Sequence, residues 1–253
     1  MRKNWLALAC GVAVMPAMVH AQEAEQESAQ ERAWDIETEA SYLLSRGNSE
    51  SESIVGKVNA AHDGVNWRQT AKAEAVNTMS DNDDGEEERT AERYYASYKL
   101  DRKLTDNNYL FNVLTYDKDN FSGFQYQASY ALGLGRRFLE TPAHTLDLEA
   151  GPGYRVECLE DSYAGCDNKD ESVIARFAGN YKWTISENAS FRQAVSTEVG
   201  EDNTSVRSET SLTSKINDHF AMRLSHLVTR DSEVPAGTHN TDQETSVSLV
   251  YTF

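Results

Sequence analysis

The side chains that could take part in catalysis are few and widely spaced in this chain of 253 residues. A hydrolytic site needs a nucleophilic Ser, a His that accepts its proton and a third group that orients the His. A lipid-hydrolysing barrel of the outer membrane places the Ser two residues after the His on one strand face. No histidine beyond residue 21 has a Ser at that position: His62, His144, His219, His226 and His239. The sequence therefore predicts a protein that is not an enzyme, with a lipid hydrolase that uses His226 as a remote alternative.

An acidic stretch, SDNDDGEEE at residues 80–88, is a candidate for cation binding. An EF-hand loop carries Asp at its first position, Gly at its sixth and Glu at its twelfth. With Gly85 in sixth place the first residue is Ser80 and the twelfth is Ala91, so the motif is absent. Weak candidate ligands remain in four carboxylates: Asp81, Asp83, Asp84 and Glu86. A solvated loop is the simpler interpretation, and we expect no cofactor.

The first residues, MRKNWLALACGVAVMPAMVHAQ, have the order of a secretory signal. Two basic residues precede an apolar run that ends at small residues, which predicts cleavage after Ala21. The apolar run is shorter than the ~20 residues that a membrane-spanning helix needs. A lipoprotein signal at Cys10 is an alternative, although apolar residues continue beyond that cysteine. Residues 22–33 are charged and polar and are expected to form a mobile N-terminal extension.

The charge of the exported chain excludes a nucleic-acid partner. Loss of residues 1–21 removes two positive charges and no acid, so the formal charge of −17 becomes −17 − 2 = −19. No basic stripe remains to neutralise phosphates. The two remaining cysteines, Cys158 and Cys166, would reside in an oxidising compartment. We therefore predict that they form a disulfide.

Apolar and polar residues alternate with period two in twelve segments between residues 34 and 253. In FQYQASYALGLGRRF, from Phe124, the aromatic and aliphatic residues share one parity and the polar residues share the other. The segments are longer than the usual five or six residues of a soluble strand. Short and long connections also alternate, as in bacterial outer-membrane barrels. The sequence thus predicts an all-β fold over residues 34–253, a 12-stranded antiparallel transmembrane β-barrel, rather than a soluble sandwich.

In such a barrel one parity faces lipid and the other faces the lumen. The predicted lumen charges are of both signs: Glu37, Lys72, Arg93, Arg137, Glu149, Arg155, Arg176, Arg207 and Glu209. Mixed signs favour a packed ion-pair network over a wide pore of one sign. Aromatic residues near strand ends are typical of interface girdles: Trp34, Trp67, Tyr109, Tyr181, Trp183, Phe220 and Phe253. A terminal aromatic such as Phe253 is also part of the signal that barrel assembly machinery reads.

Several stretches suggest a family: LLSRGNSESES after the first segment, YLFNVLTYDKDNF, YALGLGRRFLET and LDLEAGPGYRVE. Together they resemble the uncharacterised family of salt-induced outer-membrane proteins, which contains a domain of unknown function. The Gly47–Asn48 pair and the Gly-Leu-Gly of residues 133–135 are its best markers. The resemblance covers nearly all of the exported chain. It implies an outer-membrane barrel of unknown biochemical function, with no catalytic or ligand residues to carry over.

A narrow ion-lined channel, or a passive barrel that supports the envelope under stress, is the function that this pattern favours. A non-conducting structural or surface-interaction barrel is the alternative. The expected location is the cell outer membrane, reached through a cleaved signal peptide. The expected partners are outer-membrane lipid, lipopolysaccharide and the barrel assembly machinery.

Overall fold

The computed structural model describes residues 34–45, 51–81, 87–119, 124–159, 169–234 and 239–253. These residues form the twelve strands that the alternation predicts. The strands are β1 (Asp35–Ser45), β2 (Ser51–Asp63), β3 (Trp67–Asp81), β4 (Glu87–Lys103), β5 (Asn108–Asp119), β6 (Phe124–Glu140), β7 (His144–Leu159), β8 (Lys169–Thr184), β9 (Ala189–Val199), β10 (Thr204–Lys215), β11 (Phe220–Asp231) and β12 (Thr241–Thr252). Among the described residues there is no helix long and apolar enough to cross a membrane.

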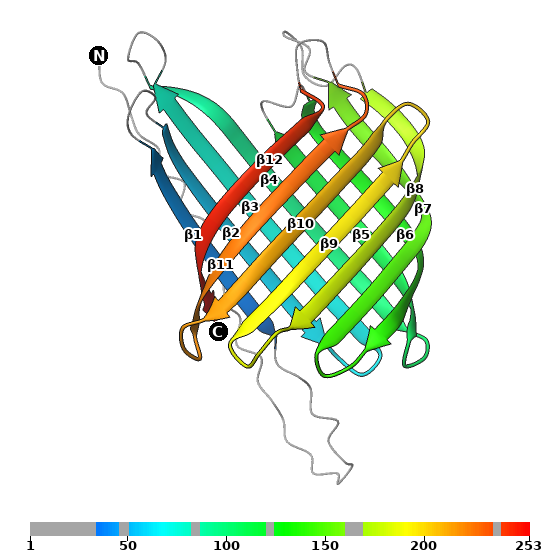
Figure 1. The fold of residues 1–253 in the computed structure, drawn as a ribbon. Coiled ribbons are helices and arrows are strands. Elements are labelled where there is room, and N and C mark those ends of the chain that lie inside the picture. The colour runs from blue at the N-terminus through cyan, green and yellow to red at the C-terminus, as the bar shows by residue number, and fades with distance from the viewer. Residues whose placement is uncertain (1–33, 46–50, 82–86, 120–123, 160–168, 235–238) are drawn as a thin grey trace, which may run out of the picture. The chain divides into compact units, whose positions relative to one another are not determined.

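The strands close into one antiparallel barrel (Figure 1). Each strand pairs with its neighbours in the sequence, and β12 returns to pair with β1, where Thr38 lies opposite Tyr251. Closure leaves no unpaired sheet edge, so every strand finds backbone partners on both sides. The prediction of a 12-stranded antiparallel barrel is confirmed.

The two ends of the barrel differ in their connections. We call the "turn end" the end with the short connections 64–66, 104–107, 141–143, 185–188 and 216–219. Backbone hydrogen bonds close these turns, for example from Leu104 N to Asn108 O at 2.9 Å. The opposite end carries the connections 46–50, 82–86, 120–123, 160–168, 200–203 and 232–240, and we call it the "loop end". Four of these six connections are longer than the turns, as predicted, whereas 120–123 and 200–203 have only four residues.

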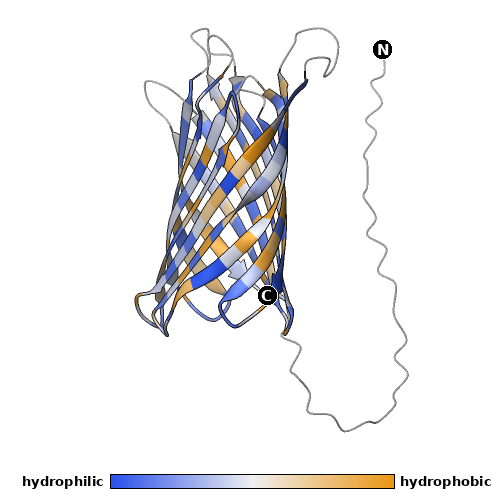
Figure 2. Ribbon diagram, turned by 90° about the vertical axis from the view of Figure 1, so that its right-hand side faces the viewer, coloured by the Kyte–Doolittle hydropathy of each residue, from blue (hydrophilic) through white to orange (hydrophobic). Residues whose placement is uncertain are grey.

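The alternation of residue types is also an alternation of burial. Along β11, Arg223, Ser225 and Leu227 are buried while Met222 and Leu224 are exposed. Hydrophilic and hydrophobic residues accordingly alternate along the strands (Figure 2). The interior of this barrel is therefore mainly polar, and its exterior is mainly apolar, because successive side chains of a strand point to opposite faces.

Strands β6 and β7 approach each other closely at two glycines. The pairing of β6 with β7 runs as far as the Ala131–Gly153 pair and resumes at the Leu134–Ala150 pair. Pro152 lies in the interruption between these two pairs. A Cβ atom at Gly133 would lie 2.3 Å from the carbonyl oxygen of Ala150. A Cβ atom at Gly151 would lie 2.0 Å from the carbonyl oxygen of Leu132. Only residues without a side chain fit where the two backbones come this close.

Candidate functional site

The lumen is the candidate functional site, because it gathers most of the charged side chains of the strands. The nine charges that the sequence assigned to it lie on the inward parity, the parity of the buried side chains. Arg155 retains only 2% of its exposed area, and Glu149 retains 6%. Charges buried this deeply require partners, since an unpaired buried charge is strongly destabilising.

Arg207 extends into the lumen. Its Nη2 donates a hydrogen bond of 2.6 Å to Glu74 on β3. Its guanidinium carbon lies 4.1 Å from the centre of the Tyr95 ring on β4, a cation–π contact. Strand β4 is six strands from β10 in the ring of twelve, so Arg207 meets a side chain that projects from the opposite wall. We call Arg207 with Glu74 and Tyr95 the Arg207 bridge.

Further ion pairs connect strands that are not neighbours. Arg93 on β4 pairs with Glu244 on β12 at 2.9 Å, and Lys57 on β2 lies 3.5 Å from Glu209 on β10. Arg223 on β11 pairs with Glu37 and Glu39 on β1. The side chains of Lys57 and Glu74 are only 3% and 4% exposed. Paired charges thus fill the middle of the lumen, as the mixed signs of the inward residues suggested.

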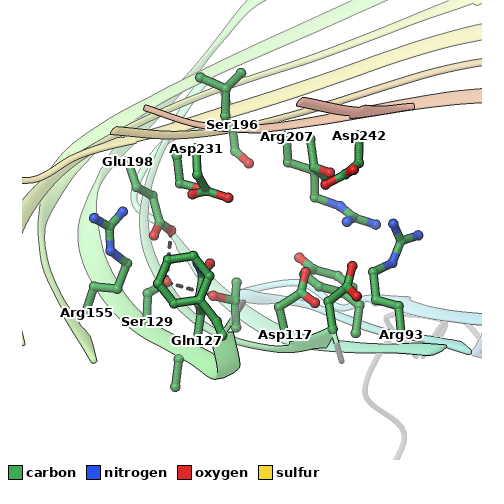
Figure 3. A pocket seen from close by; sticks show the side chains of 18 of the residues that line it. Arg93, Asp117, Gln127, Ser129, Arg155, Ser196, Glu198, Arg207, Asp231 and Asp242 are labelled. Atoms are coloured by element: carbon green, nitrogen blue, oxygen red, sulfur yellow. Dashed lines mark hydrogen bonds between the residues drawn. The ribbon is translucent and has the colours of Figure 1, made fainter. Parts of the chain in front are cut away.

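A cavity of about 90 Å³ opens between the Arg207 bridge and the loop end (Figure 3). Arg207 and Asp242 extend into it from one wall, and Asp117 and Ser129 extend from the facing wall. Glu198 accepts hydrogen bonds from Ser129 Oγ at 2.9 Å and from Arg176 Nη1 at 2.6 Å. About 10–15 Å³ of such space holds one water molecule, so this loop-end cavity accommodates several.

A second, larger cavity of about 290 Å³ lies at the turn end. Its polar lining includes Lys182, Arg192, Ser211 and Lys215. Along β10 the loop-end cavity reaches Arg207 and the turn-end cavity begins at Ser211. Glu209, which pairs with Lys57, lies between them. The two cavities are therefore separated along β10 by the layer that holds the Lys57–Glu209 pair and the Arg207 bridge.

An apolar cluster lies inside the barrel, toward the turn end. It consists of Tyr109, Phe111, Val113 and Ala131, all less than 6% exposed. The Tyr109 ring packs against Gly135, where a Cβ atom would lie 2.1 Å from it. Tyr109 Oη donates a hydrogen bond of 2.8 Å to Glu149. The prediction that Tyr109 belongs to an interface girdle is therefore wrong, because the glycine beside it leaves room for the ring inside the lumen.

The other predicted girdle residues lie toward the ends of strands, on the outward parity. The exposed fractions of Trp67 and Trp183 are 43% and 40%. Phe253 is exposed, and its ring meets that of Tyr251 edge-on, with 4.7 Å between centroids. Its backbone N–H donates to the carbonyl of Ile36 at 3.1 Å, which fixes the chain end against β1. His226 also faces outward, within hydrogen-bonding distance of Thr245 Oγ1 at 2.8 Å.

Two predicted features reach beyond the described residues. Cys158 is buried and disulfide-bonded, whereas Cys166 lies outside the described residues. In the acidic stretch, Asp81 is the last residue of β3. Asp83, Asp84 and Glu86 lie within residues 82–86, which are outside the described residues as well. In the part of the chain that the structure covers, no group of three or more His, Cys, Asp or Glu side chains is placed to hold a metal ion.

The Cys158–Cys166 disulfide remains a prediction with a direct test. A pair eight residues apart would close only the connection between β7 and β8, so its reduction should loosen that connection more than the barrel. We expect unreduced, denatured protein to resist thiol labelling at both cysteines, and to accept two labels after reduction. Labelling of both thiols without reduction would contradict the disulfide.

Comparison with known proteins identifies a family, a relative and several solved structures of similar fold. Residues 38–253 match the family model described as "Protein of unknown function, DUF481". The uncharacterized protein YdiY of Escherichia coli (strain K12) is 34% identical over 214 residues, which cover 84% of this chain and 80% of that protein.

Solved structures with similar folds have much lower identity. The NanC porin is 12% identical with a TM-score of 0.49, and the match covers 87% of this chain and 99% of that chain. The translocator domain of the autotransporter NalP from Neisseria meningitidis is 11% identical with a TM-score of 0.48, over 89% and 90% of the two chains. At this level the likeness assigns no function.

Proposed function

Because this chain belongs to the DUF481 family of proteins of unknown function, its role has to come from the barrel itself, and we propose that it is a narrow, ion-lined channel of the outer membrane. The channel would pass small ions and exclude sugars and larger solutes. The observation that supports this proposal most is the charged lumen, which opens into a cavity toward each end and is narrowed between them by the Arg207 bridge.

The exterior of the barrel supports a location in the membrane. Large apolar side chains are exposed there, including Leu134 at 63%, Phe177 at 53% and Leu249 at 50%. Such a surface suits hydrocarbon, and a closed barrel satisfies the backbone hydrogen bonds that hydrocarbon cannot. In outer-membrane barrels the short turns face the periplasm, which would place the turn end there. Lipid, lipopolysaccharide and the assembly machinery that reads Phe253 are the partners that this location implies.

The interior supports the passage of ions rather than of larger solutes. A barrel with a purely structural role needs no space for water in its lumen. Here, however, charged side chains line cavities of about 90 and 290 Å³. Fixed charges close to a narrow path replace part of the hydration shell of a passing ion. The Arg207 bridge narrows the path against a sugar ring, because the Arg207 side chain on β10 meets the Tyr95 and Glu74 side chains of the facing strands.

A non-conducting barrel is the second candidate, and the depth of the ion pairs favours it. Asp101 is 1% exposed and pairs with Arg68 at 2.7 Å and with Lys99 at 3.1 Å. Ion pairs that are buried this deeply are more typical of a structural core than of a pore. A role in envelope stress, which the family resemblance implies, is compatible with either candidate.

Solute flux in proteoliposomes tests the proposal. We expect vesicles that contain the folded, exported chain to release potassium and chloride faster than empty vesicles while they retain sucrose. The physical reason is the narrow charged path, which admits ions and excludes a disaccharide. Retention of both salt and sucrose would favour the non-conducting barrel. Release of sucrose at the same rate as salt would show a wide pore and contradict the narrowing by Arg207.

A further inference from the structure

Basic side chains without a carboxylate partner gather in the turn-end cavity. Lys182 on β8, Arg192 on β9 and Lys215 on β10 all line it. None of the three makes an ion pair within 4.0 Å to another residue in the described ranges, whereas most inward-facing basic side chains do. These three residues, which we call the basic mouth, are thus an exception within a lumen of paired charges.

Two members of the basic mouth face each other directly. Lys182 and Arg192 are opposite in the β8–β9 ladder, on the inward parity. Like charges directly opposite in an antiparallel pair repel and destabilise the sheet. Farther from the mouth, Lys72 lies within electrostatic range of Arg192 but also of the carboxylates of Glu209 and Glu74, so the excess of positive charge is confined to the mouth. Such repulsion is relieved when an anion occupies the space between the cations.

Acidic residues also line this cavity, and one of them, Glu37, lies within electrostatic range of Arg192 and Lys182. Glu37 is already paired with Arg223 at 2.8 Å. Glu187 and Asp218 are exposed residues of the turns 185–188 and 216–219, and Asp35 is exposed at the start of β1. The three cations are exposed as well, but the strand register holds Lys182 and Arg192 opposite each other. The carboxylate of Glu37, shared with Arg223, offsets only part of their charge.

We propose that the basic mouth binds small oxyanions of the phosphate and sulphate class, as the entry site of the channel for such solutes; this rests on the proposed function. The cavity of about 290 Å³ is large enough for the anion and several waters. Ser211 lies opposite Arg192 in the β9–β10 ladder and also lines the cavity. Its hydroxyl can donate to an oxyanion, together with the charge-assisted hydrogen bonds from the three cations.

Binding of inorganic phosphate to the folded, detergent-solubilised chain tests this site without any need for conduction. Titration calorimetry at constant ionic strength should show saturable binding to the wild type. The triple variant K182Q/R192Q/K215Q should bind about tenfold or more weakly, because three charge-assisted contacts are lost. The matched control R102Q/R136Q/R230Q removes the same charge from exposed outward positions and should bind phosphate as the wild type does.

Absence of saturable binding to the wild type would overturn the site, as would equal weakening in both triple variants. If the first triple variant does not fold, the single variant Arg192→Gln replaces it, with a several-fold weakening expected. Phosphate binding by a protein that conducts no ions would keep the site and remove the channel. Conduction without phosphate binding would keep the channel and remove the site.

Discussion

Replacement of Arg207 by alanine is expected to raise the conductance of the barrel in planar bilayers by about threefold or more. The Arg207 side chain on β10 meets the Glu74 and Tyr95 side chains of the facing strands. Its removal joins the loop-end cavity to the space around Glu209 and leaves the carboxylate of Glu74 as an added negative charge. Selectivity should therefore also shift toward cations.

The matched control is Arg230→Ala, which removes an exposed arginine of the outward parity near the loop end. Its conductance and selectivity should equal those of the wild type. Removal of one partner of a buried ion pair costs roughly 3–5 kcal/mol, so Arg207→Ala should also unfold more easily. The double variant R207A/E74A removes both charges and should recover part of that stability while it keeps the raised conductance. Wild-type conductance in both Arg207 variants would contradict the bridge.

Replacement of Gly133 by valine is expected to prevent the barrel from folding. Even a Cβ atom at this position would lie 2.3 Å from the carbonyl oxygen of Ala150 and 2.6 Å from the Cα of Gly151. Both contacts are with backbone, so no side-chain rotation relieves them. Overpacking usually costs about 1–3 kcal/mol, and a clash with backbone inside a closed barrel should exceed that range. Heat-modifiable migration on a denaturing gel measures the folded fraction, which should be lost.

Gly56→Val is the matched control for this prediction. Gly56 also lies within a strand, in β2, but a Cβ atom there meets nothing within 4 Å. Valine suits a strand better than glycine does, so the folded fraction should equal or exceed that of the wild type. Normal folding of the Gly133 variant would show that β6 and β7 do not approach as closely as the structure indicates.

The strands of the barrel were predictable because the alternation of apolar and polar residues with period two is a strong local signal. In β11 and β12 no two neighbouring side chains are both buried, and each buried one is followed by a more exposed one. The orientation of β5 was not predictable in this way. Both of its parities are apolar, with Tyr109, Phe111 and Val113 on one and Leu110 and Leu114 on the other. Residue type therefore does not choose between lumen and lipid.

A signal for the correct orientation does exist on the neighbouring strand. Gly133 lies opposite Phe111 and Gly135 lies opposite Tyr109 in the β5–β6 ladder. Glycines opposite aromatic residues leave room for the rings to lie against the strand. The Gly-Leu-Gly that marks the family resemblance thus has two physical roles: Gly135 leaves room for the Tyr109 ring inside the barrel, and Gly133 allows the backbone of β7 to approach.

The cross-lumen contacts could not be derived from the sequence. Period two assigns Arg207 and Glu74 to the interior, yet they are 133 residues apart and lie on strands that are not neighbours. Which inward charges meet depends on the tilt and stagger of the closed barrel. The basic mouth was not predicted for the same reason. Whether a cation has a carboxylate partner is known only once the side chains around it are known.

Single-channel recording of the wild-type chain in planar bilayers tests the central claim, that a narrow ion path runs through the lumen. Small, discrete conductance steps in potassium chloride are expected, and they should persist with a tetraalkylammonium salt only at strongly reduced amplitude, because the Arg207 bridge limits the width of the path. Bilayers that stay silent with both the wild type and Arg207→Ala, under conditions in which the barrel is shown to be inserted, would contradict the channel and leave a structural barrel.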